Sequence, residues 1–198
     1  MSTPHRAECL PAIFGFLERI GLQVLRAPVG EAPFLPGIRI DRGTLVVEPE
    51  ALTASGDLLH EAGHLACAPA EIRPRLDGNV KASLDGLREA APDGPVAELP
   101  NDARRLACIL QGDEPMAVAW SASALIELGL PVDSVFYPGS YGSPEGVVPV
   151  ALLQQLEMGL HPGIPWLALA GMTDLPPRFA GDPVPPVPWP RMRRWVQN

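Results

Sequence analysis

Two histidines and a glutamate stand close together in the segment His60-Glu61-Ala62-Gly63-His64. An α-helix turns by about 100° per residue, so side chains four positions apart project from the same face, one turn apart. Two imidazoles placed in this way can bind one metal ion, and Zn²⁺ is the ion that this spacing favours. Glu61 follows the first histidine, where its carboxylate can reach a water molecule at the metal. The spacing therefore predicts a zinc site with Glu61 as general base.

The surrounding residues favour the helix that this site requires. Ser55 or Asp57 can cap its start, apolar residues and alanines fill it, and Pro69 closes it. Cys67 lies seven positions after His60 on the same stripe. Its thiolate is an alternative ligand, although a cysteine at such a place more often fills the core. A further alternative is a buried helix in which the two histidines are incidental.

A catalytic zinc site needs a third protein ligand and leaves one position for water. Glu114 is the best candidate, because it opens a predicted helix whose next residues are small or apolar, so that the helix packs inside. A carboxylate at the start of a buried helix is costly unless it is paired or bound to metal. Asp113 and His161 are the alternatives. Asp113 is also predicted to cap that helix, because its short side chain reaches the first backbone N–H groups.

The remaining elements indicate an α+β fold that positions these residues. A first helix is expected over residues 6–20. Residues 37–41 and 44–48 alternate apolar and polar around Arg42-Gly43, which predicts a β-hairpin leading into the metal helix. Further helices are predicted over residues 80–91, 101–128 and 149–160, the second interrupted at Gly112, with a flexible linker over 92–100. We expect a single domain over residues 1–180 and a proline-rich tail, lying on the surface, over 181–198.

Composition limits the class of protein. The chain has 198 residues, of which 46% are hydrophobic and 19% charged, which suits a globular domain with its own core. The net charge of −8 argues against direct binding of nucleic acid. Three cysteines without close spacing, no signal peptide and no run of 18 apolar residues predict a cytoplasmic protein without disulfides or a membrane span.

Two motifs carry a resemblance to a known family. The order helix, β-hairpin, His60-Glu61-x-x-His64 helix, and then a helix opening Glu114-x-x-Ala117-x-x-Trp120-Ser121 resembles the ImmA/IrrE-type zinc peptidases, which belong to the gluzincins. Members of that family carry Glu-x-x-Ala-x-x-Phe-Ala on the helix that gives the third ligand. The resemblance covers residues 6–130 loosely. It implies a zincin-like fold, Zn²⁺ held by His60, His64 and Glu114, and hydrolysis of a protein or peptide.

The other parts of a peptidase site have candidates as well. Zinc peptidases need a donor that stabilises the oxyanion, and Tyr137, Tyr141 or His161 could serve; packing of the two tyrosines within their loop is the alternative. The hairpin could offer an open strand edge to an extended substrate. The sequence thus predicts a zinc-dependent metallopeptidase that acts on a protein or peptide. The competing hypothesis is a metal-binding domain without protease activity, with a binding or regulatory role.

Overall fold

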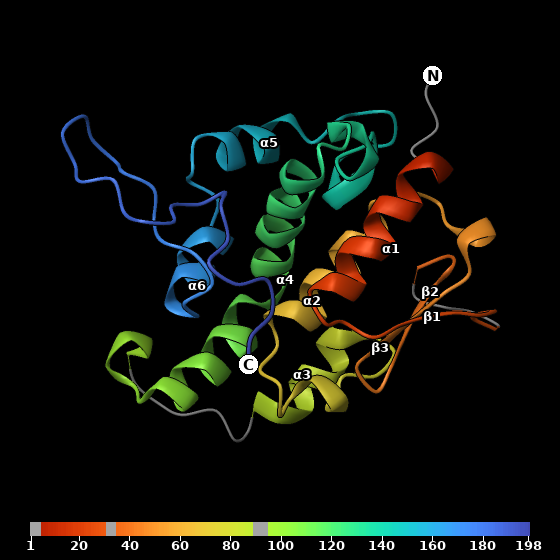
Figure 1. The fold of residues 1–198 in the computed structure, drawn as a ribbon, viewed down its shortest axis with the longest axis horizontal. Coiled ribbons are helices and arrows are strands. Elements are labelled where there is room, and N and C mark those ends of the chain that lie inside the picture. Colours follow the sequence, from red (N-terminus) through yellow and green to blue (C-terminus); the bar gives the residue numbers. More distant parts are fainter. Residues whose placement is uncertain (1–4, 31–34, 89–94) are drawn as a thin grey trace.

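The computed structural model describes residues 5–30, 35–88 and 95–198. A small sheet is combined with helices in these residues, so the predicted α+β class is confirmed. The strands are β1 (Val24–Arg26), β2 (Ile38–Asp41) and β3 (Thr44–Val47). The α-helices are α1 (Leu10–Arg19), α2 (Asp57–Cys67), α3 (Val80–Arg88), α4 (Asn101–Leu128), α5 (Val150–Glu157) and α6 (Gly163–Leu169). Figure 1 shows the sheet at one side of the molecule and α4 running through the middle of the helices.

The predicted hairpin is confirmed. β2 pairs antiparallel with β3, and Asp41 lies opposite Thr44. Arg42 and Gly43 form the turn with φ angles of 46° and 80°. A two-residue turn with positive φ at both positions matches the twist of the two strands that it joins. β3 also pairs in parallel with β1, which leaves β2 as an edge strand of the described sheet.

The helix α4 packs between α2 and α6, and two glycines allow the close approach. A Cβ atom at Gly63 of α2 would lie 2.9 Å from the carbonyl oxygen of Ala117. A Cβ atom at Gly163 of α6 would overlap the carbonyl oxygen of Pro115. Glycine has no Cβ atom, so at both positions it lets the two helix backbones approach without this overlap. Gly63 lies between Glu61 and His64, so the contact brings the part of α2 that carries both histidines directly against α4.

The predicted interruption of α4 at Gly112 is wrong. One continuous helix runs from Asn101 to Leu128 and includes both Gly112 and Pro115. Glycine in a helix costs about 1 kcal/mol relative to alanine. Here the missing side chain makes room for the indole of Trp166, whose Cγ atom would lie 2.6 Å from a Cβ at Gly112. Tertiary packing against α6 therefore overrides the local preference. Asp113 consequently lies inside a helix and does not cap one.

The first and third helices are close to their predicted ranges. The first begins with a 3₁₀ turn over Ala7–Cys9 and continues as α1. The helix ends at Arg19, and Gly21 follows in a left-handed conformation. The third covers Val80–Arg88, and Gly86 does not interrupt it. The predicted end of this helix after residue 88 and the first part of the linker, residues 92–94, lie outside the described residues. A short 3₁₀ helix at Val96–Glu98 then leads to α4.

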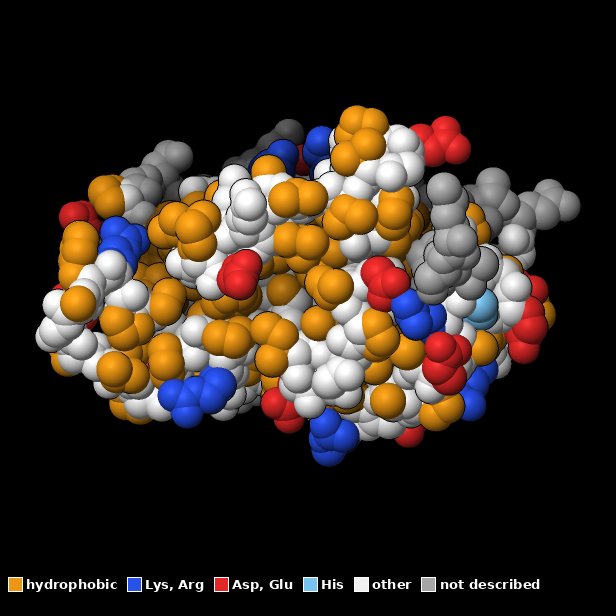
Figure 2. Space-filling view, turned by 90° about the horizontal axis from the view of Figure 1, so that it is seen from above, with side chains coloured by type: hydrophobic (Ala, Val, Ile, Leu, Met, Phe, Trp, Pro, Cys, Tyr) orange, Lys and Arg blue, Asp and Glu red, His pale blue; other side chains and the backbone are white. Residues whose placement is uncertain are grey.

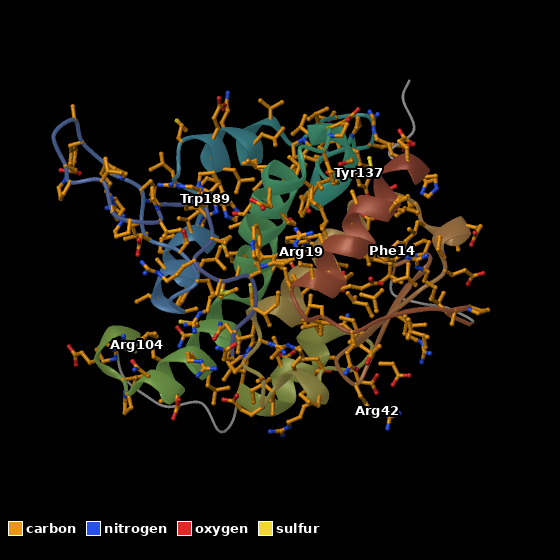
Figure 3. All side chains as sticks on the ribbon, viewed as in Figure 1. Phe14, Arg19, Arg42, Arg104, Tyr137 and Trp189 are labelled. Carbon is orange, nitrogen blue, oxygen red and sulfur yellow. The ribbon has the colours of Figure 1, made fainter. Side chains whose placement is uncertain are left out.

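The proline-rich segment after residue 180 has no helix or strand, and some side chains near its end are buried against the helices. Trp189 and Gln197 are buried, and the ring of Trp195 packs 4.9 Å from that of Phe16 and 5.6 Å from that of Trp120, between centroids. Burial of large aromatic side chains accounts for this difference from the predicted surface tail. Figure 3 shows Trp189 on the side of α4 away from the sheet.

The outer surface of the second half of the chain is rich in apolar side chains. From residue 126 onward, ten large hydrophobic side chains are exposed in the described chain: Ile126, Val132, Val147, Val148, Val150, Met158, Leu160, Leu175, Phe179 and Val184. Figure 2 shows hydrophobic side chains across much of the face seen from above, with few charged groups between them. None of the described helices is both long and apolar enough to cross a membrane.

Candidate metal centre

The helix α2 brings its two histidines together as the spacing requires. The Nε2 atoms of His60 and His64 lie 3.2 Å apart, and their rings are nearly perpendicular. One imidazole nitrogen of each histidine and a carboxylate oxygen of Glu61 all lie within 4.8 Å of one another. Glu61 and His64 are buried among the helices, while His60 is partly exposed. The three groups therefore form a compact cluster at one face of α2.

Glu114 approaches this cluster from α4. Its Oε1 atom lies 3.5 Å from Nε2 of His60, and its Oε2 atom lies 3.5 Å from Nε2 of His64. Around a tetrahedral zinc ion with bonds of 2.0 to 2.1 Å, ligand atoms are separated by about 3.3 Å. A hydrogen bond with His60 lowers the pKa of Glu114 and outweighs partial burial, so the carboxylate is ionised. The three side chains fit a tetrahedral metal ion.

Asp113 lies behind His64 and not among the ligand atoms. Its Oδ1 atom is 2.7 Å from Nδ1 of His64, and its side chain is only 12% exposed. The carboxylate accepts the Nδ1–H proton, which fixes the ring orientation and leaves Nε2 free toward the cluster. Carboxylate–histidine pairs of this kind orient and strengthen metal ligands. The structure thus separates the two adjacent acids: Glu114 lies near the Nε2 atoms of both histidines, and Asp113 bonds to Nδ1 of His64.

The charges around His64 favour a cation. Burial alone would lower the pKa of His64, but the hydrogen bond and charge of Asp113, with the charges of Glu61 and Glu114, raise it to about 9. In the absence of a metal ion, a proton therefore occupies this site at neutral pH. A dication can take the place of that proton, because the same carboxylates stabilise both.

Tyr141 packs against the other histidine. Its ring centroid lies 5.4 Å from that of His60 in an edge-to-face arrangement, and it also contacts Phe136. The backbone of Tyr141 is left-handed, with φ 52° and ψ 40°, a conformation that costs a non-glycine residue about 1 kcal/mol. Burial raises the pKa of Tyr141, so its hydroxyl stays protonated and able to donate. Among the described residues, the buried Nδ1 atom of His60 has no hydrogen-bond partner.

Tyr137 is held by an acid that the sequence analysis assigned to a helix cap. Its hydroxyl donates a hydrogen bond of 3.0 Å to Oδ1 of Asp57. Asp57 makes no capping hydrogen bond, since it is the first residue inside α2. Burial raises the pKa of Asp57 to about 6, despite the hydrogen bond from Tyr137. The spacing places Asp57 on the helical face of His60 and Glu61, three and four positions before them, but it does not indicate Tyr137 as the partner.

His161 and Cys67 are not brought to the cluster. His161 lies between α5 and α6, where its Nδ1 atom accepts a hydrogen bond of 3.2 Å from the backbone N–H of Gly163. It does not line the pocket at the metal cluster. Cys67 is fully buried, and burial raises the pKa of its thiol well above the usual value. Like His161, it does not line the pocket at the cluster.

The end of α2 is fixed by residues that the sequence analysis did not single out. Arg73 donates hydrogen bonds to the carbonyl oxygens of Leu65 and Ala68. The backbone N–H of Gln197 donates to Ala66, and its side-chain amide donates to Cys67 at 2.6 Å. These are the carbonyls that a helix end leaves without partners. The far end of the chain thus completes the helix that carries both histidines.

A pocket of about 930 Å³ opens at the metal cluster. On the side of α2 and α4 it is lined by the cluster, by Asp57 and Asp113, and by Tyr137 and Tyr141. On the other side it is lined by β2 and by the start of α3, including Arg39 and Lys81. The volume is at the upper end of the range that small-molecule sites occupy. The pocket is therefore large enough to admit part of a peptide.

The edge of β2 presents unpaired backbone groups to this pocket. The two-residue turn fixes the ladder so that Arg39 and Asp41 bond to β3, while the N–H and C=O groups of Ile38 and Ile40 point off the sheet. The C=O of Leu35 accepts a hydrogen bond from the N–H of Ile38, and the N–H of Gly78 donates one to the C=O of Ile40. Within the described residues, the C=O of Ile38 and the N–H of Ile40 have no backbone partner.

No known protein family, curated protein or solved structure matches this chain. The functional interpretation therefore depends on the geometry of the cluster and the pocket.

Proposed function

We propose that this protein is a zinc-dependent metallopeptidase with a zincin-like arrangement, related in its motifs to the ImmA/IrrE-type peptidases. His60, His64 and Glu114 would hold the Zn²⁺ ion. The observation that carries this proposal is the placement of three side chains from two helices: the two Nε2 atoms lie 3.2 Å apart, each lies 3.5 Å from one carboxylate oxygen of Glu114, and Asp113 is bonded to the other nitrogen of His64. This arrangement favours a metal site over two incidental histidines, because Asp113 and Glu114 both lie against the imidazoles.

The residues around the metal position have distinct roles in peptide hydrolysis. A bound zinc ion supplies a more acidic water and polarises the scissile carbonyl. Glu61 accepts the proton of the attacking water and passes it to the leaving amine. Tyr141 keeps its proton and its ring lies against His60, so it is one candidate for a donor to the developing oxyanion, although its hydroxyl would first have to leave its hydrogen bond with Ser121. Tyr137 donates to Asp57 and would have to exchange that partner to do the same.

An extended peptide is the substrate that the edge of β2 favours. The free C=O of Ile38 and N–H of Ile40 can bond a single residue of a peptide running parallel to β2, or two residues of an antiparallel one. Addition of a strand to an open edge gives binding through the main chain and is independent of the peptide sequence. The scissile bond would then pass the metal cluster within the same pocket.

The substitution Glu61→Gln tests this function. Glutamine keeps the size of the side chain and both imidazoles but cannot accept a proton, so zinc content should remain while hydrolysis is lost by at least about 100-fold. The measurement pairs metal analysis with cleavage of an unfolded protein substrate, before and after chelation and after zinc is restored. If Glu61→Gln cleaves as fast as the wild type, the general-base role is wrong. Zinc in the wild type without any hydrolysis would instead favour a metal-binding domain with a regulatory role.

A further inference from the structure

The charges that line the pocket are divided between its two sides. The acidic lining residues come from α2 and α4; they are Asp57, Glu61, Asp113 and Glu114. Asp113 and Glu114 lie against the two histidines, and Asp57 accepts a hydrogen bond from Tyr137. The cationic lining residues, Arg39, Lys81 and Arg88, come from β2 and α3. No acidic residue lines the pocket on the side of β2 and α3 among the described residues. This side is therefore positive in a chain whose net charge is −8.

The three cations differ in how far they are already neutralised. Arg88 is paired with Asp85 at 2.5 Å, and two of its nitrogens face the carbonyl oxygen of Leu110. Arg39 lies 3.6 Å from Asp41, a loose and exposed pair. Lys81, the only lysine of the chain, is exposed and has no salt bridge within the described residues. Lys81 is thus the cation that is most available to a ligand.

The strand edge places a bound peptide next to these cations. Side chains alternate along β2, so Arg39 is directed away from Ile38 and Ile40, which are buried in the core. A peptide paired with β2 presents every second side chain on the face of Arg39, and opposite charges on neighbouring strands attract. Lys81 lines the same side of the pocket from the first turn of α3.

We propose that Lys81, with Arg39, makes the pocket select peptides that carry a carboxylate side chain on the β2–α3 side. This inference rests on the proposed zinc peptidase function and names its substrate class: acidic peptides. Because the groups are exposed, one ion pair of this kind changes affinity by about 2- to 5-fold, and salt weakens the effect.

Peptide hydroxamates provide a test that does not depend on cleavage. The hydroxamate group anchors the probe at a zinc ion, and the attached tripeptide carries Glu, Gln or Lys at one position. Two series are needed, with the hydroxamate at the carboxyl or the amino end, because the peptide can run in either direction along β2. Dissociation constants are measured with zinc-loaded Glu61→Gln, and with that variant further changed to Lys81→Gln, Lys81→Glu or Arg178→Gln. Arg178 is exposed and lies outside the pocket, so it is the matched control.

The expected result is that one series binds with Glu tighter than Gln and Gln tighter than Lys, each step about 2- to 5-fold at low salt. Lys81→Gln should abolish most of this order, Lys81→Glu should reverse it, and Arg178→Gln should leave it unchanged. Equal binding of the three probes in both series, or an order that survives Lys81→Gln, would overturn the acidic selectivity while leaving the zinc site intact. If no hydroxamate binds in either series, the proposed zinc site fails, and the inference fails with it.

Discussion

At the scale of single residues, the hydrogen bond between Asp113 and His64 determines the orientation and the charge of one histidine of the candidate site. From the sequence, Asp113 is an alternative metal ligand and is expected to cap a helix. The structure places its carboxylate 2.7 Å from Nδ1 of His64. The difference could not be read from the sequence, because two adjacent acids at the start of an expected helix satisfy both roles. Only the packing of α2 against α4 decides which of them faces which nitrogen.

This pair predicts a pH dependence of metal binding. Because the pKa of His64 is raised to about 9 in the metal-free protein, zinc must displace a proton at lower pH. The apparent zinc affinity should therefore rise about tenfold per pH unit between roughly pH 7 and 9 and level off above that range. Competition with a chelator of known pH dependence measures this curve.

The substitution Asp113→Asn provides the comparison. It removes the charge that raises the pKa of His64, so the curve should level off at a lower pH, and zinc affinity should fall by about 10- to 100-fold. Asp102→Asn is the control, since this acid of α4 is 93% exposed. A variant Asp113→Asn with the affinity and pH profile of the wild type would show that Asp113 does not support the ligand.

At the scale of elements, α2 and the hairpin could be predicted because their signals are local. Apolar spacing around the histidines and the Arg42-Gly43 turn determine these elements within a few residues of sequence. The continuity of α4 could not be predicted in the same way. Its glycine and proline are typical of a helix break, and the contact of Gly112 with Trp166 joins residues far apart in the chain. The hydrogen bond between Tyr137 and Asp57 could not be predicted either, because it joins residues that are 80 positions apart in the chain.

The contact between α2 and α4 at Gly63 gives a prediction at this scale. A Cβ atom in Gly63→Ala would lie 2.9 Å from the carbonyl oxygen of Ala117, so the two helices must move apart. We expect a loss of about 1 to 3 kcal/mol in the free energy of unfolding and weaker zinc binding, because the histidines and Glu114 then separate. Urea denaturation of the metal-free protein and a zinc titration measure the two effects.

Gly86→Ala is the matched control for this change. Gly86 lies in α3, and nothing comes within 4 Å of a Cβ atom built there. Alanine at this position should stabilise the protein by about 0.5 to 1 kcal/mol without any change in zinc binding. Equal zinc affinity in Gly63→Ala and the wild type would mean that the close approach of the helices does not position the site.

At the scale of the whole molecule, the last described residues of the chain contact both helices of the candidate site, α2 and α4. Trp195 accepts a hydrogen bond of 2.8 Å from the indole of Trp120 in α4, and Gln197 bonds to the last carbonyls of α2. The segment thus ties together the two helices that carry the candidate ligands. Its composition predicted an extended tail, and nothing in the spacing indicated which buried groups it would reach.

Loss of the Gln197 side chain should accordingly destabilise the protein. Gln197→Ala leaves the carbonyl oxygen of Cys67 buried without its partner, which costs about 1 to 3 kcal/mol in the free energy of unfolding. Asn198→Ala, at the exposed neighbouring position, should change stability by less than about 0.5 kcal/mol. Chemical denaturation of both variants measures the difference. Equal stabilities would indicate that the end of α2 does not need this contact.

The central claim is that Zn²⁺ lies between His60, His64 and Glu114. Anomalous diffraction at the zinc edge, from crystals of protein purified without added metal, tests it most directly. The expected result is one zinc peak bonded to the two Nε2 atoms at about 2.0 to 2.1 Å and to the carboxylate of Glu114, with Asp113 still bonded to Nδ1 of His64. A zinc ion bonded to Asp113, Cys67 or His161, or a cluster that holds no zinc after zinc is supplied, would contradict the claim.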